Sequence, residues 1–198
     1  MKKTAIGVAA AAAAGAAYLL APGQEPSGHM YVMRGLFGGA GFQFSRGVDS
    51  VAYKAAKEHN LGITVKSWRS SSWMCSEAAE QYAKDKKPVF LAGHSLGANE
   101  VADVAHCLKA KGVPVAFALF YDPTPFVACV PDNVKFATSW RRSYPLDLGG
   151  GYIKRCNGST KDISNITIPN SRHVTIDDLP VVHDGTLKRI GIAMNKGK

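Results

Sequence analysis

The chain has 198 residues, of which 46% are hydrophobic and 20% charged, a composition that is typical of globular proteins and excludes disordered and collagen-like chains. The formal net charge is +9, but its lysines and arginines occur in short scattered groups without interleaved aromatic residues or a known nucleic-acid motif. We interpret these groups as solvated faces, so no nucleic-acid partner is expected and one compact domain is predicted.

The first 22 residues are set apart from the single domain that we predict over residues 23–198. Lys2 and Lys3 precede an apolar run over residues 4–20, which is the layout of a secretion signal. The run is at the lower limit for crossing a bilayer and consists mostly of alanine. Residues 1–22 are therefore interpreted as either a cleaved signal peptide or an uncleaved membrane anchor. Both alternatives predict an exported protein that is periplasmic, secreted or attached to the membrane.

From residue 29 onward, short apolar runs alternate with longer segments of helical period. The apolar runs predict strands, in chain order, at residues 30–35, 63–68, 89–93, 115–121, 134–140 and 166–168. The periodic segments predict helices around residues 48–56, 75–82, 96–110 and 182–193. Ser45 lies where it would cap the first of these helices. This order of elements predicts a three-layer α/β/α sandwich with a mostly parallel central sheet.

The strongest functional signal is the motif Gly93-His94-Ser95-Leu96-Gly97. It matches G-x-S-x-G, in which the serine occupies a strained turn between a strand and a helix. The predicted strand before the motif and the predicted helix after it supply that context. The two glycines are needed because side chains at those places would collide with the neighbouring helix and strand. Ser95 is therefore predicted to be a catalytic nucleophile.

A serine hydroxyl requires a base within hydrogen-bond reach, and the base is itself oriented by a carboxylate. Three histidines follow Ser95. His106 lies inside the helix after the motif and is expected to point away from the site. His173 stands in a loop directly after the last predicted strand, whereas His183 falls where the final helix begins and is interpreted as a surface or capping residue. We predict that His173 is the general base.

The best-placed carboxylate is that of Asp122, which ends a buried strand and projects from the same sheet edge as the nucleophile. Asp132 and Asp147 remain alternatives, the latter in the loop after the next strand. Asp177 and Asp178 are near the predicted base in sequence, but we interpret them as caps of the last helix. Asp122 is the predicted acid.

A nucleophilic serine of this kind also requires two backbone N–H donors for the oxyanion of the intermediate. Leu96 supplies the first because it follows the nucleophile. Leu36 or Phe37 is predicted to supply the second, from the glycine-rich turn at residues 35–39 after the first strand. Glycines in that turn allow the backbone to approach a substrate closely.

Four cysteines would be able to pair in the oxidising compartment that an export signal implies. They allow three connectivities, which the sequence does not rank. Cys75 and Cys107 lie in helical patterns and are interpreted as small core residues. Cys129 and Cys156 lie in loop-like sequence and are the better candidates for a disulfide.

The chain resembles the α/β-hydrolase superfamily, and within it the small lipase-like and thioesterase-like members, over about residues 31–190. The specific part is Gly-His-Ser-Leu-Gly at 93–97, together with a spacing of 27 residues from nucleophile to acid. The resemblance implies the minimal α/β-hydrolase fold, with Ser95, Asp122 and His173 as nucleophile, acid and base.

The activity that this resemblance implies is hydrolysis of a carboxylic ester or thioester through an acyl-enzyme, with no cofactor or metal. The substrate would be a small-molecule or lipid-like acyl ester. Little sequence separates Pro123 from Val134, so no large lid is expected and interfacial activation is disfavoured. A non-catalytic envelope binding protein and an acyltransferase remain alternatives. The first has no need of a nucleophile, acid and base together, and the second shares the acyl-enzyme with hydrolysis.

Overall fold

The computed structural model describes residues 25–36, 38, 45–143 and 149–195 of the chain. The predicted signal or anchor at residues 1–22 lies outside this part, so its role stays a prediction. Within the described residues, every helix is too short or too polar to cross a membrane.

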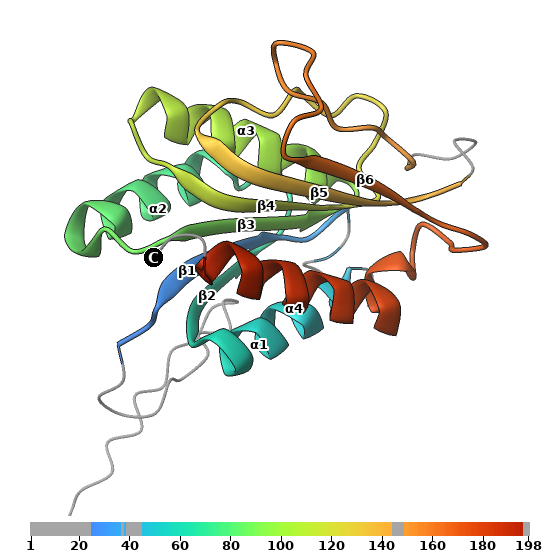
Figure 1. Cartoon of the computed structure of the whole chain (residues 1–198), viewed down its shortest axis with the longest axis horizontal. Helices are drawn as coiled ribbons and strands as arrows, with labels where there is room; N and C mark the ends of the chain where they lie inside the picture. The colour runs from blue at the N-terminus through green and yellow to red at the C-terminus, as the bar shows by residue number, and fades with distance from the viewer. Residues whose placement is uncertain (1–24, 37, 39–44, 144–148, 196–198) are drawn as a thin grey trace, which may run out of the picture.

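A six-stranded sheet forms the middle layer of the molecule (Figure 1). Its strands follow the order β2-β1-β3-β4-β5-β6, and each neighbouring pair is parallel. The carboxyl ends of all six strands therefore meet at one edge of the sheet. The strands are β1 (Gly28–Met33), β2 (Leu61–Lys66), β3 (Val89–His94), β4 (Val115–Tyr121), β5 (Val134–Arg142) and β6 (Ile163–Ile168).

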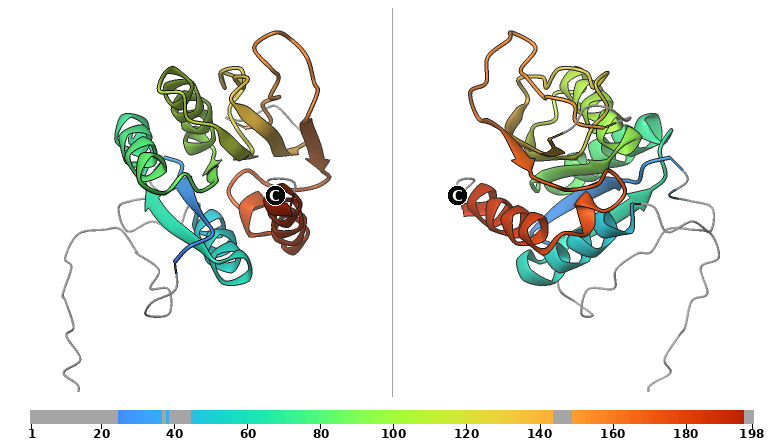
Figure 2. Two further views of the ribbon diagram at one scale, coloured as in Figure 1. Left: turned by 60° about the vertical axis from the view of Figure 1, so that its left-hand side comes forward. Right: turned by 90° about the vertical axis from the view of Figure 1, so that its right-hand side faces the viewer.

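Two helices cover each face of the sheet, which confirms the predicted three-layer sandwich (Figures 1 and 2). Helices α1 (Arg46–His59) and α4 (Pro180–Asn195) pack against each other on one face. Helices α2 (Ser71–Asp85) and α3 (Leu96–Ala110) do so on the other. A single 3-10 turn, η1 (Ile176–Asp178), precedes α4. Helix α3 and strand β4 have their predicted bounds, and the other elements begin or end a few residues away.

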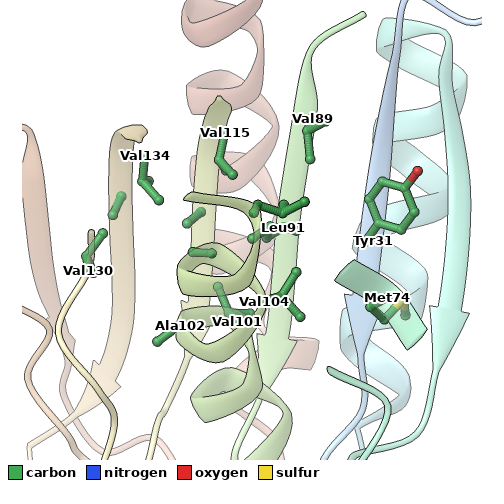
Figure 3. Packing of buried hydrophobic residues seen from close by; sticks show 14 of the residues in the cluster. Tyr31, Met74, Val89, Leu91, Val101, Ala102, Val104, Val115, Val130 and Val134 are labelled. Carbon is green, nitrogen blue, oxygen red and sulfur yellow. The ribbon is translucent and has the colours of Figure 1, made fainter. Parts of the chain in front are cut away.

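Alternate residues of the central strands feed two separate apolar cores. Tyr31 and Leu91 point toward α2 and α3, where they pack with Met74 and Val101 (Figure 3). Their chain neighbours, such as Phe90, belong to the core beneath α1 and α4. Strand β3 is buried at every position, as the continuous apolar run over residues 89–93 predicts for that part of it.

The start of α3 is pressed against the ends of two strands. A Cβ atom added to Gly93 would overlap the backbone of Gly97, and one added to Gly97 would overlap the carbonyl oxygens of Met33 and Arg34. Both motif glycines are therefore required by backbone-to-backbone contact. The contact fixes the turn between β3 and α3, where Ser95 lies.

Both pairs of cysteines form disulfides. Cys129 and Cys156 are bonded with their Cα atoms 4.8 Å apart, which confirms the predicted pair. The interpretation of Cys75 and Cys107 as unpaired core residues is wrong, because they are bonded with their Cα atoms 6.1 Å apart. Helices α2 and α3 pack side by side, and this packing brings the two thiols face to face.

Replacing Cys75 and Cys107 together by alanine is expected to lower the free energy of unfolding by about 3–4 kcal/mol, since their disulfide closes a 32-residue separation in the unfolded chain. Urea unfolding without reductant measures the loss. The Cys129→Ala, Cys156→Ala variant is the comparison, because its bond spans a similar 27 residues. Free thiols titrated in the unreduced, denatured wild type would contradict the pairing.

Candidate active site

Three of the residues predicted to form the site lie in one hydrogen-bonded row. The Oγ atom of Ser95 is 2.7 Å from Nε2 of His173, and Nδ1 of the same imidazole is 2.6 Å from Oδ2 of Asp122. Ser95 comes from the turn after β3, Asp122 from the end of β4, and His173 from the loop after β6. The parallel sheet brings these ends to one edge, although 78 residues separate Ser95 from His173.

The backbone is strained at two members of this row. Ser95 has a φ of 57° and Asp122 a φ of 46°, both in the left-handed region that residues with a Cβ atom rarely occupy. Such conformations persist only where the surrounding structure enforces them. At Ser95 the close contact between β3 and α3 supplies that constraint, and the side chain is directed out of the turn toward His173.

The carboxylate of Asp122 is fully buried and surrounded by donors. Its Oδ1 accepts the backbone N–H groups of Arg142 at 3.1 Å and Gly150 at 2.8 Å. The Nε of Arg142 lies 3.0 Å from Oδ2. Burial by itself raises the pKa of Asp122, but the hydrogen bonds from His173 and from these two backbone N–H groups outweigh it and hold the pKa below its ordinary value. The group is therefore an anion that can orient and stabilise a charged imidazole.

Arg142 and the glycines at 149 and 150 were not predicted from the sequence. Gly149 lies so close to the row that an added Cβ atom would overlap both Oδ2 of Asp122 and Nδ1 of His173. Only glycine leaves room for that hydrogen bond. The signal that could have indicated this role is the run of three glycines at 149–151, in the segment after the strand that follows Asp122.

The predicted oxyanion turn begins directly against Ser95. A Cβ atom added to Gly35 would lie 2.9 Å from Cβ of Ser95. The N–H of Gly35 is already bonded to Ser45 Oγ at 3.0 Å, whereas the N–H groups of Leu36 and Leu96 have no acceptor among the described residues. Leu96 is the first residue of α3, where backbone N–H groups and the helix dipole favour negative charge. Phe37, the other predicted donor, lies outside the described residues.

Two predicted helix caps are wrong. Ser45 occupies the N-cap position of α1, but its side chain makes no capping hydrogen bond. The N–H of Val48 in α1 is instead bonded to Oδ2 of Asp177 at 3.0 Å. Asp177 therefore caps the first helix of the chain rather than the last, and Asp178 is exposed. Local sequence could not indicate this, because Val48 and Asp177 are 129 residues apart.

The remaining alternatives for the acid and base lie elsewhere. Asp132 is exposed and paired with Lys109 at 2.9 Å, and Asp147 lies outside the described residues. His106 is bonded to the carbonyl oxygen of Cys129 at 2.9 Å. In the described part of the chain, His106 with the sulfurs of Cys129 and Cys156 is the one group with close metal-ligand atoms, and those sulfurs are bonded to each other.

His183 is buried, which corrects the interpretation of it as a surface residue. Its Nε2 is 2.6 Å from the carbonyl oxygen of Asp177, and its Nδ1 is 2.9 Å from Nζ of Lys54. These contacts join α1 to the start of α4. The side chain of His183 contributes no atom to the row that contains Ser95.

Comparisons with known proteins identify a family. Residues 42–146, just over half of the chain, match the model of the alpha/beta hydrolase fold family. An arylesterase structure has a TM-score of 0.60 at 14% identity, covering 87% of this chain and 77% of its own. The RedJ thioesterase of the prodiginine pathway in Streptomyces coelicolor has a TM-score of 0.51 at 11% identity, covering 89% and 91%. The structure of human thioesterase 2 has a TM-score of 0.52 at 12% identity, and the match covers 84% of this chain and 96% of that protein. At these identities the likeness shows a shared fold, and the curated proteins contain no match.

Replacing Asp122 by asparagine is expected to lower the free energy of unfolding at pH 7 by about 1–3 kcal/mol, because buried donors lose a charged acceptor. The lowered pKa of Asp122 means that its carboxylate stabilises the fold above its ordinary value of 3.8 and loses this effect as the pH falls through the lowered pKa. The difference in free energy of unfolding between wild type and variant, measured by urea titration, should therefore be smaller at pH 3 than at pH 7.

The control for this experiment is Asp132→Asn, whose carboxylate is exposed. It is expected to unfold like the wild type at both pH values. An Asp122→Asn deficit of equal size at pH 7 and pH 3 would show that the carboxylate charge is not what stabilises the site.

Proposed function

Since the chain belongs to the alpha/beta hydrolase fold family, we propose that it is a serine hydrolase that cleaves a carboxylic ester or thioester through an acyl-enzyme. The observation that supports this most directly is the unbroken row from Ser95 Oγ through His173 to the carboxylate of Asp122, with distances of 2.7 and 2.6 Å. These contacts support the assignment, because acyl transfer requires a nucleophile, a base and an acid in this order.

In the first half of the reaction, Ser95 Oγ attacks the substrate carbonyl carbon while His173 Nε2 takes the hydroxyl proton. The charge that develops on the imidazole is stabilised by Asp122, which also holds Nδ1 as a donor. When the tetrahedral intermediate collapses, His173 returns the proton to the leaving alcohol or thiol. The acyl group stays on Ser95 as an ester.

In the second half, a water molecule takes the place of the leaving group. His173 removes a proton from the water as its oxygen attacks the acyl carbon, and the same proton then returns to Ser95 Oγ. The products are a carboxylic acid and the original enzyme. In both halves the N–H of Leu96 and that of Leu36 or Phe37 would bind the oxyanion, and the amino end of α3 adds a favourable dipole.

The substrate is expected to be a compact acyl ester or thioester. The loop that follows Asp122 enters β5 at Val134 without an intervening helix, so this connection carries no lid domain. An arylesterase and two thioesterases share the fold, which supports both bond types. Short acyl chains fit this arrangement because a long chain requires more covering surface.

The proposed site of action is outside the cytoplasm or at the membrane. Residues 1–22 have the layout of an export signal or anchor, as described above. The two disulfides are consistent with an oxidising compartment.

The nucleophile and base can be tested together. A fluorophosphonate probe should label the wild type and fail to label Ser95→Ala. His173→Ala should lower kcat on a p-nitrophenyl ester on the order of 10³-fold, because a base acting in the transition state is lost. His183→Ala removes a histidine that is hydrogen-bonded to Asp177 and Lys54 and not to Ser95. This variant should lose some stability and keep kcat within a few-fold of wild type. A dead His183→Ala beside an active His173→Ala, both folded by circular dichroism, would reverse the assignment.

Export can be tested by cell fractionation and amino-terminal sequencing of the mature protein. We expect either a new amino terminus near residue 22 or the full-length chain in the membrane fraction. Full-length protein confined to the soluble cytosol would refute both forms of the proposal.

A further inference from the structure

His94, the residue before the proposed nucleophile, lies between the two halves of the site. Its Nε2 is 2.7 Å from the backbone carbonyl oxygen of His173, and its Nδ1 is 2.6 Å from Ser45 Oγ. We propose that His94 is a positioning residue that joins the loop of the base and the oxyanion turn into one frame around Ser95. This inference rests on the proposed function, because it assigns His94 a part in the same reaction.

For a neutral imidazole, the hydrogen bonds around His94 allow one assignment of donors. A carbonyl oxygen only accepts, so Nε2 of His94 carries a proton and donates to His173. Nδ1 of the neutral ring is then an acceptor, and the hydroxyl of Ser45 donates to it. The same hydroxyl oxygen accepts the N–H of Gly35 at 3.0 Å. Three successive hydrogen bonds therefore run from the oxyanion turn to the base loop.

The surroundings of His94 keep its ring neutral. The side chain is 2% exposed, and this burial lowers its pKa, with the nearby His173 adding to the effect. The carboxylates of Asp177 and Asp122 act in the opposite direction, and Oδ1 of Asp177 lies 3.9 Å from Nε2. A proton on Nδ1 would remove the acceptor that Ser45 needs. The neutral form is thus the one that completes the connection.

Ser45 carries an independent sign of this role. It has a φ of 64° in the left-handed region and stands at the N-cap of α1, where a serine normally bonds the helix backbone. Its hydroxyl instead accepts the N–H of Gly35 and donates to Nδ1 of His94, while Asp177 caps the helix. The structure thus retains a strained serine at a cap position whose capping function another residue performs. Strain of this kind accumulates where geometry serves function.

The connection bears on rate because each end holds a reacting group. Gly35 lies so close to Ser95 that an added Cβ atom would be 2.9 Å from the serine Cβ, and it is followed by Leu36, a proposed oxyanion donor. At the other end, Nε2 of His94 bonds the backbone carbonyl oxygen of His173, and the ring centroids of the two histidines lie 5.0 Å apart. A displacement of about 1 Å in such groups can cost about 10²-fold in rate. The loss would fall on kcat, because no atom of this connection needs to contact bound substrate.

Two conservative variants separate the two ends. His94→Asn keeps an acceptor near the Nδ1 position for Ser45 and cannot reach His173, whereas His94→Gln reaches His173 and gives up the bond to Ser45. Each is expected to lower kcat on a p-nitrophenyl ester by about 10- to 100-fold with KM within about threefold. Ser45→Ala breaks the same hydrogen bond as His94→Gln and also the one from Gly35, so it should lower kcat at least as much, and adding His94→Gln to it should cost little more.

The matched control is His183→Asn. His183 is also buried, and its Nε2 also bonds a backbone carbonyl oxygen, that of Asp177 at 2.6 Å. Its variant should lose stability like the His94 variants and keep kcat within about threefold of wild type. Equal losses of kcat in both would show that His94 acts through stability alone and would overturn the inference.

A second measurement is independent of turnover. Nitrogen NMR of the imidazoles should show His94 as the neutral tautomer protonated at Nε2, and Ser45→Ala should shift its Nδ1 resonance. A proton on Nδ1 would overturn the inference. A wild type that neither turns over esters nor reacts with fluorophosphonate would refute the proposed function, whereas an active wild type with fully active His94 variants would refute only the role of His94.

Discussion

The contact between the end of β3 and the start of α3 is the constraint on which the site depends. Gly93 and Gly97 let two backbones touch, and Gly97 also rests on the end of β1. Because the helix begins so close to the sheet, Ser95 has no room for an ordinary conformation and adopts a φ of 57°. Its hydroxyl is then presented at the sheet edge where the ends of β4 and β6 deliver Asp122 and His173. The strain at one residue follows from the packing of three elements.

Much of the fold could be predicted because its determinants are local. Continuous apolar runs mark strands buried on both faces, and helical periodicity marks the covering layers, so α3 and β4 were predicted to the residue. The bounds of β6 were harder to predict, because all of its residues are intermediate or exposed and its sequence mixes polar residues with isoleucine, which gives a weak apolar signal. The pairing of Cys75 with Cys107 also escaped prediction. Periodicity shows which face of a helix is apolar but does not show which helix that face meets.

The site was predictable where chain order governs it and unpredictable where distant residues complete it. Ser95, Asp122 and His173 follow from a motif and from strand ends. Arg142 and Gly149 enter only because β5 lies beside β4 and because Gly149 and Gly150, later in the chain, lie against the carboxylate. Ser45 and Asp177 do not cap the helices that follow them in sequence, because their side chains bond groups that are far away in the chain.

The polar groups at this edge are costly to bury, and their arrangement explains why the cost is tolerated. A fully buried anion at Asp122 would destabilise the fold if it were isolated, yet it is surrounded by donors from β5 and the loop after it. His94 is kept neutral within hydrogen-bond distance of Ser45 and the backbone of His173. Left-handed backbone at Ser45, Ser95 and Asp122 costs on the order of 1–3 kcal/mol each. The two apolar cores and the two disulfides stabilise the fold and offset that strain. The rest of the fold therefore supplies the rigidity of the site.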